Sequence, residues 1–176
     1  MKTDISHAEL AKRIAEISSL EGEFLLRSGQ ISHTYFDKYR FEGNPELLRP
    51  LAKEMAALIP ADTEIIGGLE LGGVPLATAI SLETGLPAAF IRKEAKEYGT
   101  CQAIEGQDIS GRKVTFIEDV ITTGGAVSDA FKLANEAGAQ VKAVVCAIWR
   151  GEGDPHIKGV SDLPVFPVFT RAELEQ

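Results

Sequence analysis

The sequence has few cysteines and no long apolar stretch. Only two cysteines occur in 176 residues, so no disulfide framework is implied, which suits a reducing cytoplasm. The first ten residues, MKTDISHAEL, lack the apolar core of a signal peptide. No apolar run is long enough to span a membrane. We therefore expect a cytoplasmic protein that has no membrane partner.

Basic residues are also scarce. Lysine and arginine together number 18 against 26 aspartates and glutamates, which leaves a net charge of −8. This balance argues against a general binder of nucleic acid or of anionic membranes. The three histidines show no metal-ligand spacing, so the sequence predicts no zinc site. An acidic chain that binds an anion must gather its basic residues locally, and such a cluster is described below.

What the chain does contain is a regular alternation of strand and helix patterns. Hydrophobic residues make up 44% of the 176 residues, which suits one domain with a sizeable core. Short apolar runs alternate with helical spacings from about residue 45 to residue 150. This order predicts an α/β fold, a single domain with a mainly parallel sheet flanked by helices. Residues 1 to about 40 are expected to form a small hood over the carboxyl edge of that sheet.

The central stretch of the chain is Val114–Val127, which reads VTFIEDVITTGGAV. An apolar strand is expected to end at Glu118 and Asp119, and Thr122–Gly125 then forms a turn into a helix. Such a turn presents unpaired backbone N–H groups and the positive end of the helix dipole, which suit a phosphate. The two carboxylates suit vicinal hydroxyls or a hydrated Mg²⁺. The stretch therefore predicts a sugar-phosphate site, for example for phosphoribosyl pyrophosphate (PRPP).

Other readings of this stretch are weaker. An ordinary strand, turn and helix with acids placed by chance is the alternative. No Gly-Lys-Ser/Thr follows, so a Walker A loop is excluded, and the G-x-G-x-x-G spacing of dinucleotide sites is absent.

The stretch resembles the PRPP motif of type I phosphoribosyltransferases, which has a hydrophobic strand, two acids and a loop rich in threonine and glycine. By this resemblance Glu118 and Asp119 hold the ribose, and the following loop cradles the 5′-phosphate, with Thr122 also near the base. The motif alone indicates only this superfamily. The residues that it assigns to PRPP binding are Glu118, Asp119, Val120, Ile121, Thr122, Thr123, Gly124, Gly125 and Ala126.

A second glycine-rich segment is Glu64–Pro75, which reads EIIGGLELGGVP. It predicts a strand, a loop and a helix entered through Pro75, with the backbone amides of its four glycines facing an anion. A tight turn between strand and helix is the alternative. The segment resembles the pyrophosphate loop of the family, which implies that Leu71 and Gly72 contact PRPP. Orotate enzymes often carry a lysine where this chain has Gly72, so the contact here is left to backbone N–H groups or Mg²⁺.

The local basic cluster follows a short buried strand over Ala88–Ile91. Arg92, Lys93 and Lys96 lie within five residues, and the segment of about residues 93–107 has weak periodicity, which predicts a mobile charged loop. A solvated helix face with Lys–Glu pairs is the alternative.

The same segment resembles the catalytic lid of orotate phosphoribosyltransferases, which reaches into the neighbouring subunit and neutralises the leaving pyrophosphate. The resemblance implies a homodimer and assigns PRPP binding to Arg92, Lys93, Lys96 and Tyr98. Lys96, Arg92 and Asp119 are then the catalytic residues. Tyr98 stands where the family often has histidine, and it donates a hydrogen bond without a charge at neutral pH.

Two further segments resemble the orotate-binding parts of the same family. Phe24–Asp37 predicts two short strands around a turn, with the cation Arg27 and the aromatic pair Tyr35 and Phe36 close together. Arg150 follows the strand expected over Val141–Trp149, at the carboxyl edge of the sheet. A surface hairpin and an exposed loop arginine are the alternatives. The resemblance assigns orotate binding to Arg27, Tyr35, Phe36, Thr122 and Arg150.

Taken over almost the whole chain, the resemblance implies that the phosphoribosyl group of PRPP is transferred to orotate. The products are orotidine 5′-phosphate and diphosphate, a step of pyrimidine (UMP) biosynthesis. Mg²⁺ is expected to be held mainly through PRPP, with no direct protein ligand predicted. Two alternatives remain open, a phosphoribosyltransferase acting on a purine base and a non-enzymatic regulator that senses PRPP and binds nucleic acid.

Overall fold

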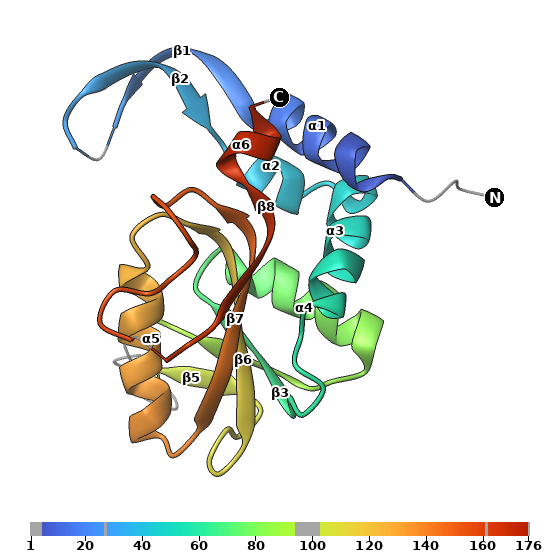
Figure 1. Ribbon diagram of the computed structural model, residues 1–176, viewed down its shortest axis with the longest axis vertical. Coiled ribbons are helices and arrows are strands. Elements are labelled where there is room, and N and C mark those ends of the chain that lie inside the picture. Colours follow the sequence, from blue (N-terminus) through green and yellow to red (C-terminus); the bar gives the residue numbers. More distant parts are fainter. Residues whose placement is uncertain (1–4, 27, 94–102, 161, 176) are drawn as a thin grey trace.

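A six-stranded sheet forms the centre of the protein (Figure 1). The computed structural model describes residues 5–26, 28–93, 103–160 and 162–175. Five strands are parallel, and the short edge strand β5 pairs antiparallel with β4. In sheet order the strands are β5 (Ile104–Gly106), β4 (Ala88–Ile91), β3 (Ile65–Leu69), β6 (Lys113–Ile121), β7 (Gln140–Trp149) and β8 (Val165–Thr170).

Helices cover both faces of this sheet, as Figure 1 shows. On one face the core joins α1 (His7–Ser18), α3 (Pro45–Ala57) and α4 (Gly73–Thr84) to the strands. On the other face α5 (Gly125–Glu136) packs its apolar side, with Val127, Ala130 and Ala134 buried. The prediction of an α/β fold with a mainly parallel sheet between helices is confirmed.

The order of the strands creates a crevice between β3 and β6. From β3 the chain passes through α4 to β4 on one side, and from β6 it passes through α5 to β7 on the other. In open α/β sheets this reversal of direction is where ligands bind, outside the carboxyl ends of the strands. Each of the two glycine-rich segments of the sequence continues past its strand into a loop. The loops after β3 and β6 therefore both lie at this crevice.

The N-terminal part forms α1, the antiparallel hairpin of β1 (Ser19–Leu25) and β2 (Ile31–Phe36), and the short helix α2 (Tyr39–Glu42). The hairpin extends from the body of the molecule near the carboxyl edge of the sheet (Figure 1). Ser6 caps α1, because its hydroxyl accepts a hydrogen bond from the backbone of Glu9. At the other end of the chain, α6 (Arg171–Leu174) begins with a capping box formed by Thr170 and Glu173.

The structure corrects the expected end of the central strand. β6 continues through Glu118 and Asp119 to Ile121, so the two acids lie within the strand instead of after it. The ladder with β3 does stop at Ile117, but β7 keeps pairing as far as Ile121 with Trp149. The strand is therefore longer on the side of β7 than its apolar run indicates.

Two other expectations are corrected as well. Gly67 and Gly68 belong to β3 and not to an anion-binding loop. A Cβ atom at Gly68 would lie 2.7 Å from the Cβ of Ala77, so this glycine admits α4 closely to the sheet. Ile104–Gly106, expected within the lid, pairs with β4 as the edge strand β5. None of the helices in the described ranges has the length and apolar character needed to cross a membrane.

Candidate active site

The two acids of β6 lie at the bottom of the crevice. Asp119 is 1% exposed and Glu118 is also buried. The backbone N–H of Asp119 donates to Glu118 Oε1 over 3.0 Å, and the N–H of Val120 donates to Asp119 Oδ1 over 2.5 Å. These bonds hold both carboxyl groups at the carboxyl end of the strand.

Two residues that the sequence analysis did not single out complete this cluster. Lys38, just before α2, places its Nζ 2.5 Å from Asp119 Oδ2. Asp119 Oδ2 accepts no hydrogen bond of regular geometry within the described part of the chain, so this contact is an ion pair. Glu42, at the end of α2, is 4% exposed and lies near Asp119, and neither of its carboxyl oxygens has a hydrogen-bond partner among the described residues. A four-residue helix has no periodic pattern, so only the chemistry of the segment could have drawn attention to either residue.

The protonation of the cluster follows from its burial. Burial, together with the neighbouring Asp119, raises the pKa of Glu42 to about 9. Burial and Asp119 also raise the pKa of Glu118 well above its usual value. Burial acts to raise the pKa of Asp119 too, but the contacts with Glu118 and Lys38 outweigh it and lower that pKa.

At neutral pH the cluster therefore contains one charged pair. Asp119 is ionised and Lys38 is protonated, because their contact also raises the pKa of Lys38 despite its burial. Glu42, with a pKa of about 9, keeps its proton at neutral pH, and burial also favours the protonated form of Glu118. A buried carboxylate with an oxygen that accepts no regular hydrogen bond from the described residues is suited to receive the donors of a sugar diol.

The loop after β6 leads directly into α5. Thr122, Thr123 and Ala126 are exposed, and Gly124 is the N-cap residue in the left-handed region with φ of 74°. No side chain in the described ranges caps this helix end. A Cβ atom at Gly124 would lie 2.9 Å from Ile157 Cδ1, and the left-handed backbone at this position favours glycine. Its open N–H groups make an anion site beside Asp119.

The loop after β3 approaches the same carboxylate. Leu71 is exposed, and Gly72 is buried against Asp119, where any Cβ atom would overlap Asp119 Oδ2. Helix α4 begins at Gly73, two residues before Pro75 and earlier than expected. Gly72 thus lets the loop come close enough to share the crevice.

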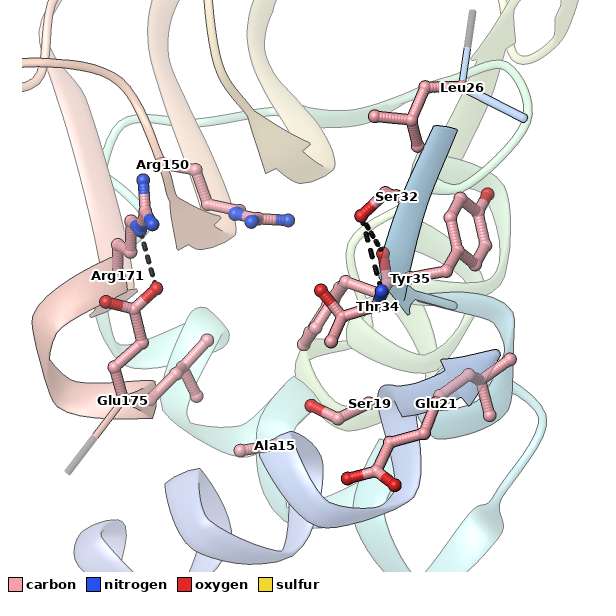
Figure 2. Close-up of a pocket in the computed structure, with 13 residues that line it drawn as sticks. Ala15, Ser19, Glu21, Leu26, Ser32, Thr34, Tyr35, Arg150, Arg171 and Glu175 are labelled. Atoms are coloured by element: carbon pink, nitrogen blue, oxygen red, sulfur yellow. Dashed lines mark hydrogen bonds and ion pairs between the residues drawn. The ribbon is translucent and has the colours of Figure 1, made fainter. Parts of the chain in front are cut away.

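Arg150 lies beside this site, at the end of β7. Its backbone N–H donates to the carbonyl of Ile121 over 2.8 Å, which joins the ends of the two strands. A cavity of about 570 Å³ lies between the hairpin, α1 and α6, and Arg150 points across it toward the hairpin (Figure 2). The guanidinium carbon is 5.3 Å from the ring centroid of Phe36. Tyr35 stacks instead on Phe24 at 5.4 Å, so the structure brings Arg150 together with Phe36 and places the Tyr35 ring on the far side of β2.

The basic cluster is only partly described. Arg92 is half-buried after β4, and its backbone N–H donates to the carbonyl of Ala103 over 2.8 Å. Lys93 is exposed, and its backbone N–H donates to Glu70 Oε2 over 3.2 Å. Arg27, Lys96 and Tyr98, three residues with expected roles, lie outside the described residues.

The side chains of the crevice bear on how Mg²⁺ could bind there. The ion prefers oxygen ligands, keeps several waters, and is often held through substrate phosphates. The one ionised carboxylate, Asp119, is buried and already paired with Lys38. This arrangement fits an ion that arrives bound to phosphate oxygens better than one held in a protein cage.

The chain is similar in sequence to known phosphoribosyltransferases. The family described as phosphoribosyl transferase domain matches residues 46–170. An orotate phosphoribosyltransferase of Nocardioides sp. is 55% identical over 96% of this chain and 94% of its own length. One of Methanocaldococcus jannaschii is 36% identical over 96% of both chains.

Solved structures give the same result. The orotate phosphoribosyltransferase of Mycobacterium tuberculosis in complex with Fe(III) dicitrate has a TM-score of 0.81 at 28% identity, over 97% of this chain and 99% of that one. An adenine phosphoribosyl transferase of Trypanosoma brucei, at 18% identity and a TM-score of 0.66 over 94% of this chain and 81% of that one, shares the fold. With a family match over most of its length and relatives of this identity, the chain belongs to the orotate phosphoribosyltransferases, within the phosphoribosyl transferase domain family.

Proposed function

We infer that this protein transfers the phosphoribosyl group of PRPP to orotate, giving orotidine 5′-phosphate and diphosphate in pyrimidine biosynthesis. The observation that carries this conclusion is the crevice between β3 and β6. There the ionised carboxylate of Asp119 lies beside the uncapped N-terminus of α5. A carboxylate for a ribose diol and open N–H groups for a phosphate are what a phosphoribosyl group requires.

The reaction needs no covalent nucleophile from the protein. The bond from ribose C1 to the pyrophosphate oxygen breaks, and its electron pair leaves with pyrophosphate. A ring nitrogen of orotate bonds to C1 and releases its proton. The protein contributes by positioning the reactants and stabilising charge.

We propose the following residue roles, which for Lys96 rest on the family resemblance alone. Glu118 and Asp119 bind the ribose hydroxyls, and Thr122–Ala126 binds the 5′-phosphate at the start of α5. Leu71 and Gly72 lie beside the pyrophosphate. The Arg150 guanidinium binds the carboxylate of orotate, and its contact with the Phe36 ring supports a flat substrate there. The lid cations Arg92, Lys93 and Lys96 offset charge on the leaving group, with Lys96 the most important for rate.

Mg²⁺ is proposed to enter with PRPP. When bound to the pyrophosphate, the ion supplies positive charge that stabilises the leaving group. The residues of this chain then bind the ribose and phosphate around it, and none of them is assigned as a direct ligand.

We further propose a cytoplasmic homodimer in which the lid of one subunit serves the site of its partner. The free thiol of Cys146, buried in the core, is compatible with a reducing compartment. Sharing can be tested by mixing Lys96→Ala subunits with Asp119→Asn subunits, since each mixed dimer has one site with neither change. Recovery of up to about a quarter of the parent activity is expected from random pairing of equal amounts, because half of the dimers are mixed and each has one intact site of two. No recovery after verified exchange of subunits would mean that each site uses its own lid.

The activity itself is tested by following the near-ultraviolet absorbance of orotate. Protein, PRPP and Mg²⁺ are combined with orotate, and parallel reactions contain adenine or xanthine. We expect the absorbance to fall in the reaction with orotate and not in those with adenine or xanthine, and we expect EDTA to abolish this loss. Turnover of a purine without turnover of orotate would overturn the assignment of Arg150 and the hood.

A further inference from the structure

Lys38 lies in the centre of the candidate site and has no role in the assignments above. It belongs to the short link between β2 and α2, and its ammonium contacts Asp119 at 2.5 Å. The Lys38 side chain is 33% exposed, whereas Asp119 is 1% exposed. A ligand that enters the crevice therefore meets the ammonium of Lys38 before it meets the carboxylate of Asp119.

The surroundings leave Lys38 as the balancing charge of Asp119. Glu42 and Glu118 also face the carboxylate, but burial raises the pKa of each, to about 9 for Glu42, so neither supplies a positive charge. The loop after β3 contributes no side chain at this point, because Gly72 lies against Asp119 Oδ2. The positive charge at this oxygen thus comes from Lys38 and not from the loop after β3.

This arrangement has a consequence for ribose binding. Hydroxyls that donate to Asp119 compete with the ammonium for the same carboxylate oxygens. An ammonium that loses its carboxylate in a half-buried site is costly unless it finds another anion. Lysine has a flexible four-carbon stem that can turn its charge to a new partner. In PRPP the pyrophosphate group is attached to the ribose carbon next to the diol, so an anion arrives together with the competing hydroxyls.

We propose that Lys38 is a PRPP-binding residue, which covers Asp119 in the free protein and turns to the pyrophosphate oxygens when the ribose diol binds Asp119. The proposal rests on the proposed function, since it takes PRPP as the ligand. It assigns the link between β2 and α2 a part in pyrophosphate binding, in addition to the loop after β3 and the lid.

The test compares two ligands that share the ribose 5-phosphate part but differ in pyrophosphate. Binding of PRPP with Mg²⁺ and binding of orotidine 5′-phosphate are measured by calorimetry for the parent and Lys38→Gln. Glutamine keeps a hydrogen-bond donor for Asp119, which protects folding, but removes the charge. We expect the dissociation constant for PRPP to rise at least about tenfold, the size of one charge-assisted hydrogen bond. The constant for orotidine 5′-phosphate should stay within about threefold.

Three further variants control the experiment. Lys38→Arg keeps the positive charge and should recover part of the PRPP affinity. Arg40→Met removes a positive charge from the neighbouring helix α2, where Arg40 pairs with Asp37, and should bind both ligands like the parent. Thermal unfolding of each variant shows whether it is folded, and Lys38→Met provides a second neutral side chain.

The outcomes separate the possibilities. PRPP binding by Lys38→Gln within twofold of the parent would overturn the proposal. An equal loss for both ligands would also overturn it, since that result means a structural role for Lys38. If the parent binds PRPP but does not consume orotate, the proposed function fails while the binding comparison still decides the role of Lys38.

Discussion

The substitution Glu42→Gln should stabilise the protein, and more so as the pH rises. Glu42 is buried against Asp119, and its pKa is raised to about 9 from an ordinary value of 4.5. In the folded protein the carboxyl keeps its proton at neutral pH, whereas in the unfolded chain it ionises. The unfolded state therefore binds fewer protons, and the free energy of unfolding falls as the pH rises between these two values. Glutamine has a similar shape and a permanent donor, and it does not ionise.

The size of the effect follows from the same two values. Each pH unit between them corresponds to about 1.4 kcal/mol. From pH 5 to pH 7, the advantage of Glu42→Gln over the parent should thus grow by up to about 3 kcal/mol. Below the ordinary pKa of 4.5 the two proteins should differ by a constant amount, because Glu42 is neutral in both states there.

Urea denaturation at several pH values provides the measurement. Parent and variant are compared at one protein concentration, so that any subunit association contributes equally. Glu16→Gln is the matched control, because Glu16 lies exposed on α1 and makes only a surface ion pair with Lys12. A difference between parent and Glu42→Gln that does not change with pH would refute the assignment of a neutral Glu42. So would an advantage that shrinks as the pH rises.

Three other predictions concern single residues. Glu54 raises the pKa of His7 through a 2.6 Å contact. The stabilisation from this contact is fully present below about pH 6.5 and is lost as the pH rises through the raised pKa. His7→Gln should therefore lower the melting temperature at pH 5.5 more than at pH 8.5. Gly72→Ala places a Cβ atom onto Asp119 Oδ2, so kcat/KM for PRPP should fall at least about tenfold, and an unchanged value would contradict the geometry of the loop. Arg150→Met should raise the KM for orotate at least about tenfold with little change in the KM for PRPP, and steady-state kinetics with each substrate varied will decide.

Much of the fold could be predicted because local signals and packing agree. The apolar runs expected as strands over Ala88–Ile91 and Val141–Trp149 form β4 and most of β7. The helix expected after the central turn forms as α5, with Val127 and Ala130 buried. In such segments the apolar period and the neighbouring strand both favour one structure.

The parts that could not be predicted depend on contacts between distant residues. β6 extends beyond Ile117 because β7 pairs with it, and no property of the β6 residues alone determines that. Lys38 and Asp119 are 81 positions apart in the sequence and meet only once the hood has folded over the sheet. The roles proposed for Arg27, Lys96 and Tyr98 fall outside the described residues and stay predictions.

The cluster around Asp119 connects two features that the sequence presents separately, the missing side chain at Gly72 and the lysine after the hood strand. A Cβ atom at position 72 would overlap Asp119 Oδ2, the oxygen that the Lys38 ammonium contacts. With Asp119 in its present conformation, position 72 can therefore hold only glycine. In this chain the positive charge at the carboxylate therefore comes from the segment before α2, and the loop after β3 contributes its backbone. It follows that a lysine introduced at position 72 would have to turn Asp119 away from Lys38 and would not simply add a second cation to the site.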